Sequence, residues 1–86
     1  MNTLLRESVA AIPADVKREF EISYLLAARL DATLKEKGIT QKQLAQLLGK
    51  RESEVSRWLT GRHNFTLRTI ALIETALDAE LISIKS

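Results

Sequence analysis

Apolar side chains recur every three or four residues along most of the chain, the spacing that gathers them on one face of an α-helix. The longest series predicts a helix that begins at Pro13 and ends before Gly38, since glycine accepts the left-handed conformation that closes many helices. Its apolar members are Val16, Phe20, Ile22, Leu26, Leu30 and Leu34. A separate short helix is expected in front of Pro13, formed by Leu5, Val9 and Ile12.

Two short helices follow, and a glycine turn separates them. Thr40 and Gln43 have the spacing of a capping box, in which each side chain bonds to the backbone amide of the other residue. A helix is therefore expected over residues 40–48, and a second one over about residues 52–60, ending at Gly61. A small alanine inside the first helix lets the two helices pack closely.

A further helix and a tail complete the chain. Thr66 can cap a helix that runs to about Leu77, whose apolar positions again repeat by three and four. Residues 81–84 fit either a short β-strand or a helical continuation. The sequence thus predicts an all-α, compact domain of five to six helices. Its expected divisions are a helical extension at 1–13, the domain at 14–80 and a tail at 81–86.

Composition removes most kinds of chemistry. The 86 residues include no cysteine and one histidine, so disulfides and cysteine-based zinc sites are excluded, and no metal, cofactor or catalytic residue is expected. No apolar run approaches the ~20 residues of a membrane span. Arg6 and Glu7 interrupt the stretch that a signal peptide needs to be apolar. We therefore expect a cytoplasmic, non-enzymatic protein that binds a partner and does not contact membranes.

Charge is distributed unevenly along the chain. The net charge is only +2, but the stretch from Lys35 to Arg68 holds eight basic and three acidic residues, a local balance of +5. The rest of the chain is at −3. A basic centre between acidic flanks is typical of proteins that bind nucleic acid. An acidic protein partner, or simply a solvated face, gives the same pattern.

The second helix of the central pair has two distinct faces. At 100° per residue, packing Val55 and Trp58 inward leaves Ser53 and Arg57 on the opposite, exposed side. A helix of nine residues is about 13 Å long and suits a major groove about 12 Å wide. Base stacking is the alternative role for Trp58, but its spacing with Val55 favours the core.

Two motif segments lie in this pair of helices. They are Thr40-Gln41-x-x-Leu44-Ala45-x-x-Leu48-Gly49 and Val55-Ser56-Arg57-Trp58 with Gly61. In this register the chain resembles the lambda-repressor-like (Cro/XRE) helix-turn-helix family over about residues 15–81. The loop at 61–66 resembles a subgroup of HigA-like antitoxins and small regulators. The resemblance implies a transcriptional regulator that binds, as a dimer, a near-palindromic operator in double-stranded DNA, with the second helix in the major groove.

Residue roles follow at the matching positions. Base contacts are implied for Glu52, Ser53 and Arg57. Phosphate contacts are expected from polar side chains around that helix: Gln41, Lys50, Arg51, Arg62 and Asn64. The resemblance also implies that Gln41 braces the recognition helix.

Simpler roles stay open for the base-contacting set. Arg57 has the fork that bonds guanine O6 and N7, yet it could instead pair with Glu54 one turn earlier. Glu52 could accept from a cytosine amine or only stabilise the positive end of its helix. Ser53 is at most a weak base contact.

Two positions depart from the family pattern. Arg51 stands where the family places a serine or threonine that caps the recognition helix, and arginine has no acceptor for that role. Leu59 and Leu34 stand where many members have a buried ion pair, so a contact between two leucines is expected instead.

The expected dimer interface is the tail. Leu81, Ile82 and Ile84 are apolar, follow the core helices and have no obvious partner within the chain. Pairing of two tails would also satisfy the edge of a terminal strand.

The leading hypothesis is that the protein is a repressor. A further hypothesis is that it is the antitoxin of a toxin–antitoxin pair, with a toxin protein as partner. This second hypothesis rests on the subgroup resemblance and on residues 1–13, which the helix-turn-helix does not need. The rival is a protein-interaction adaptor that keeps the fold without contacting DNA. Arg51, Arg57 and Arg62 together argue against the adaptor.

Overall fold

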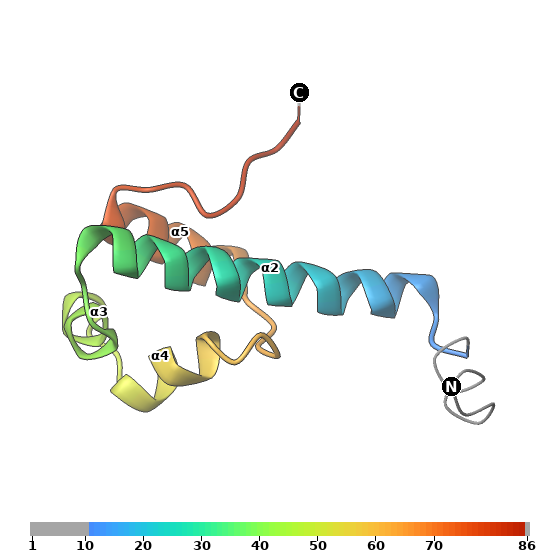
Figure 1. The fold of residues 1–86 in the computed structure, drawn as a ribbon, viewed down its shortest axis with the longest axis horizontal. Helices are drawn as coiled ribbons and strands as arrows, with labels where there is room; N and C mark the ends of the chain where they lie inside the picture. The colour runs from blue at the N-terminus through green and yellow to red at the C-terminus, as the bar shows by residue number, and fades with distance from the viewer. Residues whose placement is uncertain (1–10, 86) are drawn as a thin grey trace.

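Four helices make up the part of the chain that the structure describes (Figure 1). The computed structural model describes residues 11–85, and this range contains helices and no β-strand. The helices are α2 (Ala14–Lys37), α3 (Gln41–Leu48), α4 (Glu52–Trp58) and α5 (Leu67–Leu77). The all-α class predicted from the sequence is therefore confirmed for the described residues.

The expected count of five to six helices is wrong for this range. Most of the helix predicted at residues 1–13 lies outside the described residues. Residues 11 and 12, which are described, form a turn and a bend before α2. Residues 81–85 form neither a strand nor a helix. The amides of residues 81 and 82 instead donate to the carboxylate of Glu74, at 2.7 and 3.2 Å.

α2 ends where its sequence predicts. Gly38 has a φ of 66°, in the left-handed region, and its amide donates to the carbonyl of Lys35 at 3.2 Å. The amide of Ile39 reaches back to the carbonyl of Leu34 at 2.9 Å. At the other end, Pro13 precedes the first turn instead of entering it, with φ −55° and ψ 145°.

Thr40 caps α3 as its spacing predicts. Its hydroxyl accepts the amide of Gln43 at 3.1 Å, and the side-chain oxygen of Gln43 accepts the amide of Thr40 at 2.8 Å. This reciprocal pair satisfies two of the amides that a helix start leaves free. Gly49, with φ 66°, closes α3 and turns the chain into α4.

One apolar core joins the four helices. Its buried members are Leu30, Leu34, Leu44, Ala45, Val55, Trp58, Ile73 and Leu77. Leu59 is half-buried and packs against this cluster, to which Leu34 belongs. Trp58 is only 4% exposed, which confirms its core role and makes base stacking by this side chain wrong.

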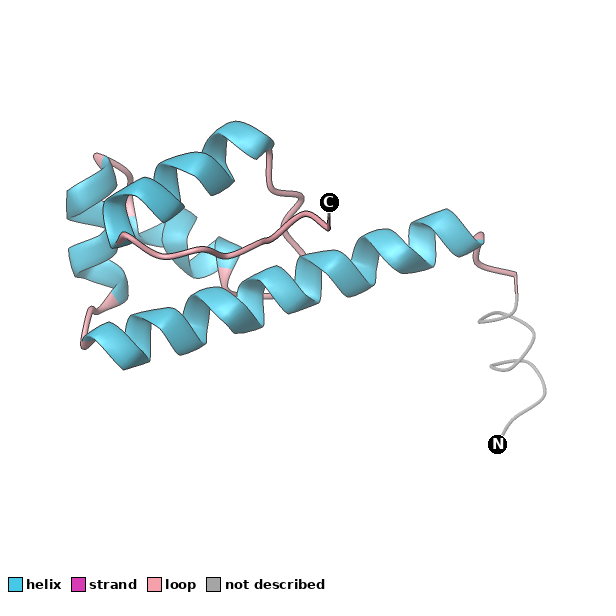
Figure 2. Ribbon diagram, turned by 90° about the horizontal axis from the view of Figure 1, so that it is seen from above, coloured by secondary structure: helices cyan, strands magenta, loops and turns pink. Residues whose placement is uncertain are grey.

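α2 is longer than the domain that it supports. Its first turns project past the ends of the other helices in both views (Figures 1 and 2). The first buried side chain of α2 is Ser23, so Val16, Phe20 and Ile22 continue the predicted apolar series without being buried. Phe20 is 55% exposed.

Candidate nucleic-acid interface

α4 lies on the surface and has the two faces that its sequence predicts. Val55 and Trp58 are buried in the core, whereas Glu52, Ser53 and Arg57 are exposed. The α3–α4 pair is packed face to face through small and apolar side chains, so α4 is held rigidly while its outer face stays open. A helix presented in this way can enter a groove without any change in the core.

Within residues 11–85, Arg57 forms no ion pair with a carboxylate. The described residues hold two ion pairs, and both lie within α2. Glu54, the alternative partner for Arg57, lies instead near the amide of Arg51 at 3.5 Å. The guanidinium of Arg57 is therefore available to an external ligand.

Arg51 stands at the start of α4 without capping it. Its backbone is extended, with φ −80° and ψ 146°, as an N-cap residue requires. Its carbonyl accepts the amides of Glu54 and Val55 at 3.0 and 3.3 Å, but the guanidinium has no acceptor atom for the other free amides. Arg51 therefore has the backbone conformation of an N-cap residue, but its side chain cannot accept a hydrogen bond from the helix amides.

Arg51→Ser is expected to stabilise the free protein and weaken its binding to DNA. A serine hydroxyl at this position can accept an α4 amide and add a few tenths to about 1 kcal/mol to the free energy of unfolding. Loss of the cation would also remove the phosphate contact expected of Arg51, so the slope of log affinity against log salt should fall by about one unit per half-site. Thermal melting and titrations at several salt concentrations measure both effects. A serine variant that melts lower and binds as tightly as the wild type contradicts the assignment.

Gln41 connects the start of α3 to α4. The hydroxyl of Ser56 donates to its side-chain oxygen at 2.7 Å, across fifteen positions of sequence. This bond supports the bracing role implied for Gln41 and leaves the amide hydrogens of that side chain free for an acceptor such as phosphate. Ser56 was missing from the predicted site, because nothing in the helical periodicity pairs it with Gln41.

The loop after α4 is tightly folded, and α4 ends sooner than predicted, at Trp58 instead of Thr60. The hydroxyl of Thr60 donates to the carbonyl of Arg57 at 2.8 Å and accepts the amide of Arg62 at 3.2 Å. Gly61 has a φ of 83°, and a Cβ there would lie 3.3 Å from the ring of Tyr24. The positive φ and this close approach both favour glycine in the turn where the chain leaves α4.

Three aromatic rings hold this loop against the core. The ring of His63 meets that of Phe65 edge-on, with centroids 5.0 Å apart, and both lie near Trp58, at 6.5 and 6.3 Å. His63 is therefore a packed loop residue. The exposed side chains of Arg62 and Asn64 stand on either side of it.

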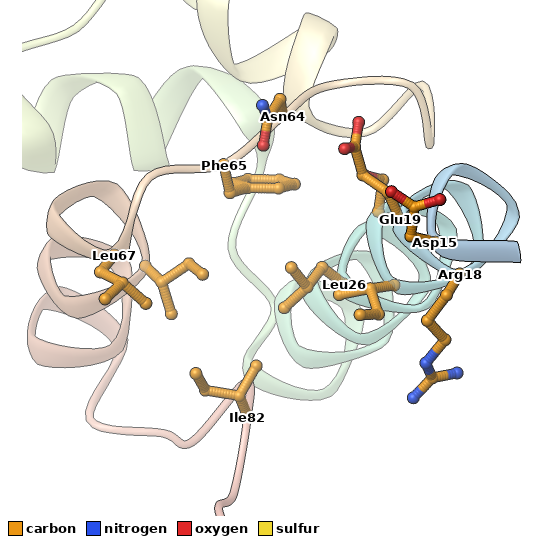
Figure 3. A pocket seen from close by; sticks show the side chains of 11 residues that line it. Asp15, Arg18, Glu19, Leu26, Asn64, Phe65, Leu67 and Ile82 are labelled. Atoms are coloured by element: carbon orange, nitrogen blue, oxygen red, sulfur yellow. The ribbon is translucent and has the colours of Figure 1, made fainter. Parts of the chain in front are cut away.

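Most of the predicted DNA-contacting residues lie around α4, whereas Asn64 lines a cavity between α2, α5 and the tail (Figure 3). The predicted dimer residues lie away from α4. Lys50 and Arg51 precede α4, and the loop with Arg62 follows it. In Figure 1 the tail runs along the opposite edge of the molecule from α4. Leu81 packs on its own core, contrary to the expectation that it lacks an intrachain partner, while Ile84 is 88% exposed.

Comparison with known proteins identifies the class. The profile of the helix-turn-helix family, of the Cro/XRE type, matches residues 30–83, more than half of the chain. The chain therefore belongs to this family of DNA-binding regulators, whose members are typically not enzymes. No curated protein and no solved structure matches the chain. No helix within residues 11–85 is both long and apolar enough to cross a membrane.

Proposed function

We propose that this protein is a sequence-specific transcriptional repressor that binds a near-palindromic DNA operator as a homodimer. The observation that carries the proposal is the outer face of α4. It presents Arg57, which has no ion-pair partner among the described residues, and cationic side chains lie before and after α4 in the chain. Because the helix behind this face is fixed in the core, the face is preorganised for a groove.

The residues of this surface fall into two proposed groups, those that contact bases and those that contact the DNA backbone. Glu52, Ser53 and Arg57 occupy the outer face of α4 and contact base edges. The residues that position the backbone of DNA without specifying its sequence are Gln41, Lys50, Arg51, Arg62 and Asn64. Glu52 also lies in the first turn of α4, where its charge favours the helix dipole.

Selection from a random DNA library, followed by titration of the selected site and a scrambled site, tests this function. We expect the selected site to bind at least about a thousandfold more tightly than the scrambled one. Three cations per half-site, Lys50, Arg51 and Arg62, predict a log–log salt slope of about −5 for two half-sites. Equal, salt-insensitive binding to both sites would refute DNA recognition and favour the adaptor.

Repression and the antitoxin role are the finer parts of the proposal. The resemblance of residues 61–66 to HigA-like antitoxins supports a toxin partner encoded nearby. A neighbouring open reading frame for a small, basic, ribonuclease-like protein, whose toxicity is relieved by co-expression of this chain, is the expected finding. A reporter gene under the selected operator should lose expression when the protein is present, and increased expression would instead mark an activator.

A further inference from the structure

We infer that the cavity between the start of α2, the start of α5 and the tail is a docking groove for a basic, amphipathic segment of a partner protein (Figure 3). The cavity has a volume of about 440 Å³ and is called the α2–α5 groove below. None of the residues of α4 lines it, so this surface is separate from the proposed contacts with bases.

The floor and walls of the α2–α5 groove are largely apolar. The apolar side chains that line it come from α2, the loop before α5, α5 itself and the tail: Ile22, Leu26, Phe65, Leu67, Ile70 and Ile82. Leu67 is 79% exposed and Ile22 is 41% exposed, although both border this apolar surface. Apolar side chains that are gathered in a hollow and left in contact with water are typical of a surface that another molecule covers.

Two carboxylates lie at one end of this apolar surface. Asp15 and Glu19 line the groove one turn apart, on the same side of α2 as Ile22. Neither carboxylate forms an ion pair within residues 11–85. Like charges at this spacing repel each other, and the positive end of the helix explains only Asp15, which lies in the first turn. A cation supplied by an occupant would relieve this repulsion.

The basic side chain that lines the groove already has a partner. The guanidinium of Arg18 lies 3.1 Å from the carboxylate of Glu21, a residue that does not line the groove. Figure 3 shows the Arg18 side chain directed away from Asp15 and Glu19. The rim of the groove is therefore acidic at this end, and it favours lysine or arginine in an occupant over acidic side chains or the phosphates of DNA.

The length of the groove favours a stretch of polypeptide as the occupant. Its lining runs along α2 from Asp15 to Leu26, which corresponds to about 17 Å of helix. An amphipathic helix of about three turns spans that length. Such a helix can place apolar side chains on the floor of the groove while its basic residues meet the two carboxylates.

Selection of peptides from a random library displayed on phage, with the full chain as bait, tests the chemistry of the partner. We expect the enriched peptides to combine lysine or arginine with leucine, isoleucine or aromatic residues, and to bind less tightly as the salt concentration rises. Replacement of the basic residues of the strongest peptide by glutamate should abolish its binding. Absence of enrichment, or enrichment of peptides that have no basic residue, overturns the inference.

Matched leucine variants locate the binding site of the selected peptide. Leu67→Ser removes an exposed apolar side chain from the groove and should raise the dissociation constant about tenfold or more, as expected for a leucine that binding buries. Leu47→Ser is the control, because Leu47 is 60% exposed on α3 and does not line the groove. It should leave the dissociation constant unchanged, and an equal effect of both variants overturns the inference.

Matched charge variants test the role of the two carboxylates. The double variant Asp15→Asn, Glu19→Gln should weaken binding about fivefold, since each exposed ion pair with the peptide contributes modestly. The control is Asp78→Asn, Glu36→Gln, which removes the same two groups from exposed positions outside the groove. A control variant that weakens binding as much as the groove variant contradicts the inference.

Solution NMR of the full chain distinguishes the partner segment from two other occupants. The signals of Leu67 and Ile82 should shift when the peptide is added, and before its addition they should not depend on protein concentration. A shift on dilution would show that a second copy fills the groove, and contacts of Leu67 with residues 1–10 would show that the start of the chain fills it. Either result overturns the inference. None of these measurements includes DNA, so their failure leaves the proposed recognition of an operator standing.

Discussion

Trp58→Ala is expected to lower the free energy of unfolding by about 3–5 kcal/mol, the usual cost of emptying a buried tryptophan site. A chain of this size has a total of roughly 4–13 kcal/mol. The side chain is 4% exposed and lies at the junction of α4, the core and the loop rings. Its loss therefore releases the recognition helix as well as destabilising the domain.

Urea unfolding at 25 °C and thermal melting measure this loss. At about 4–8 °C per kcal/mol for a domain of this size, the melting temperature should fall by more than about 10 °C. Leu47→Ala is the control, because truncation of an exposed apolar side chain changes stability by at most about 0.5 kcal/mol. A Trp58 variant that unfolds within that margin of the wild type would show that the site is not part of the cooperative core.

Arg57→Ala should cost about 1–3 kcal/mol of binding free energy per half-site and should do so at one base position only. The guanidinium has no ion-pair partner within the described residues, so its removal should leave the fold unchanged and delete the bidentate base contact that we propose. On a panel of operator variants, the alanine protein should bind the wild-type base and its substitutions at that position equally well. Arg57→Lys keeps the charge but loses the fork, and we expect it to lose the same preference.

Arg62→Ala is the matched control for base contact. Arg62 is exposed in the loop behind α4, and its loss should weaken every sequence alike and reduce the salt slope. Uniform loss of affinity from both alanine variants would reassign Arg57 to the DNA backbone. If only Arg62→Ala lost the preference for one base, Arg62 would be the residue that contacts bases and Arg57 the one that contacts the DNA backbone.

The helices were predictable because their signals are local. The Thr40 capping box, the glycine at 38 and the three-and-four spacing of α5 each involve residues within one or two turns, and the structure confirms them. The buried and exposed faces of α4 follow from the same periodicity. The end of α4 was misplaced by two residues, because the hydroxyl of Thr60 bonds to the carbonyl of Arg57 and closes the helix early.

The features that the sequence did not predict depend on contacts between residues that are distant in sequence. Periodicity shows which side of α2 is apolar, but it does not show that the buried part of this helix begins only at Ser23, after Phe20. It also gives no sign that Ser56 bonds to Gln41, or that Glu74 holds the tail amides 7 and 8 residues later. A carboxylate that accepts backbone amides replaces the ladder that a terminal strand would have needed, so β-branched residues alone were an insufficient signal.

The unburied first turns of α2 have a consequence for how this protein can diverge. None of the side chains of residues 14–22 is buried, so substitutions there are expected to change the free energy of unfolding little. A duplicated gene could therefore vary these nine positions while keeping α4 unchanged, or vary the outer face of α4 while keeping these positions.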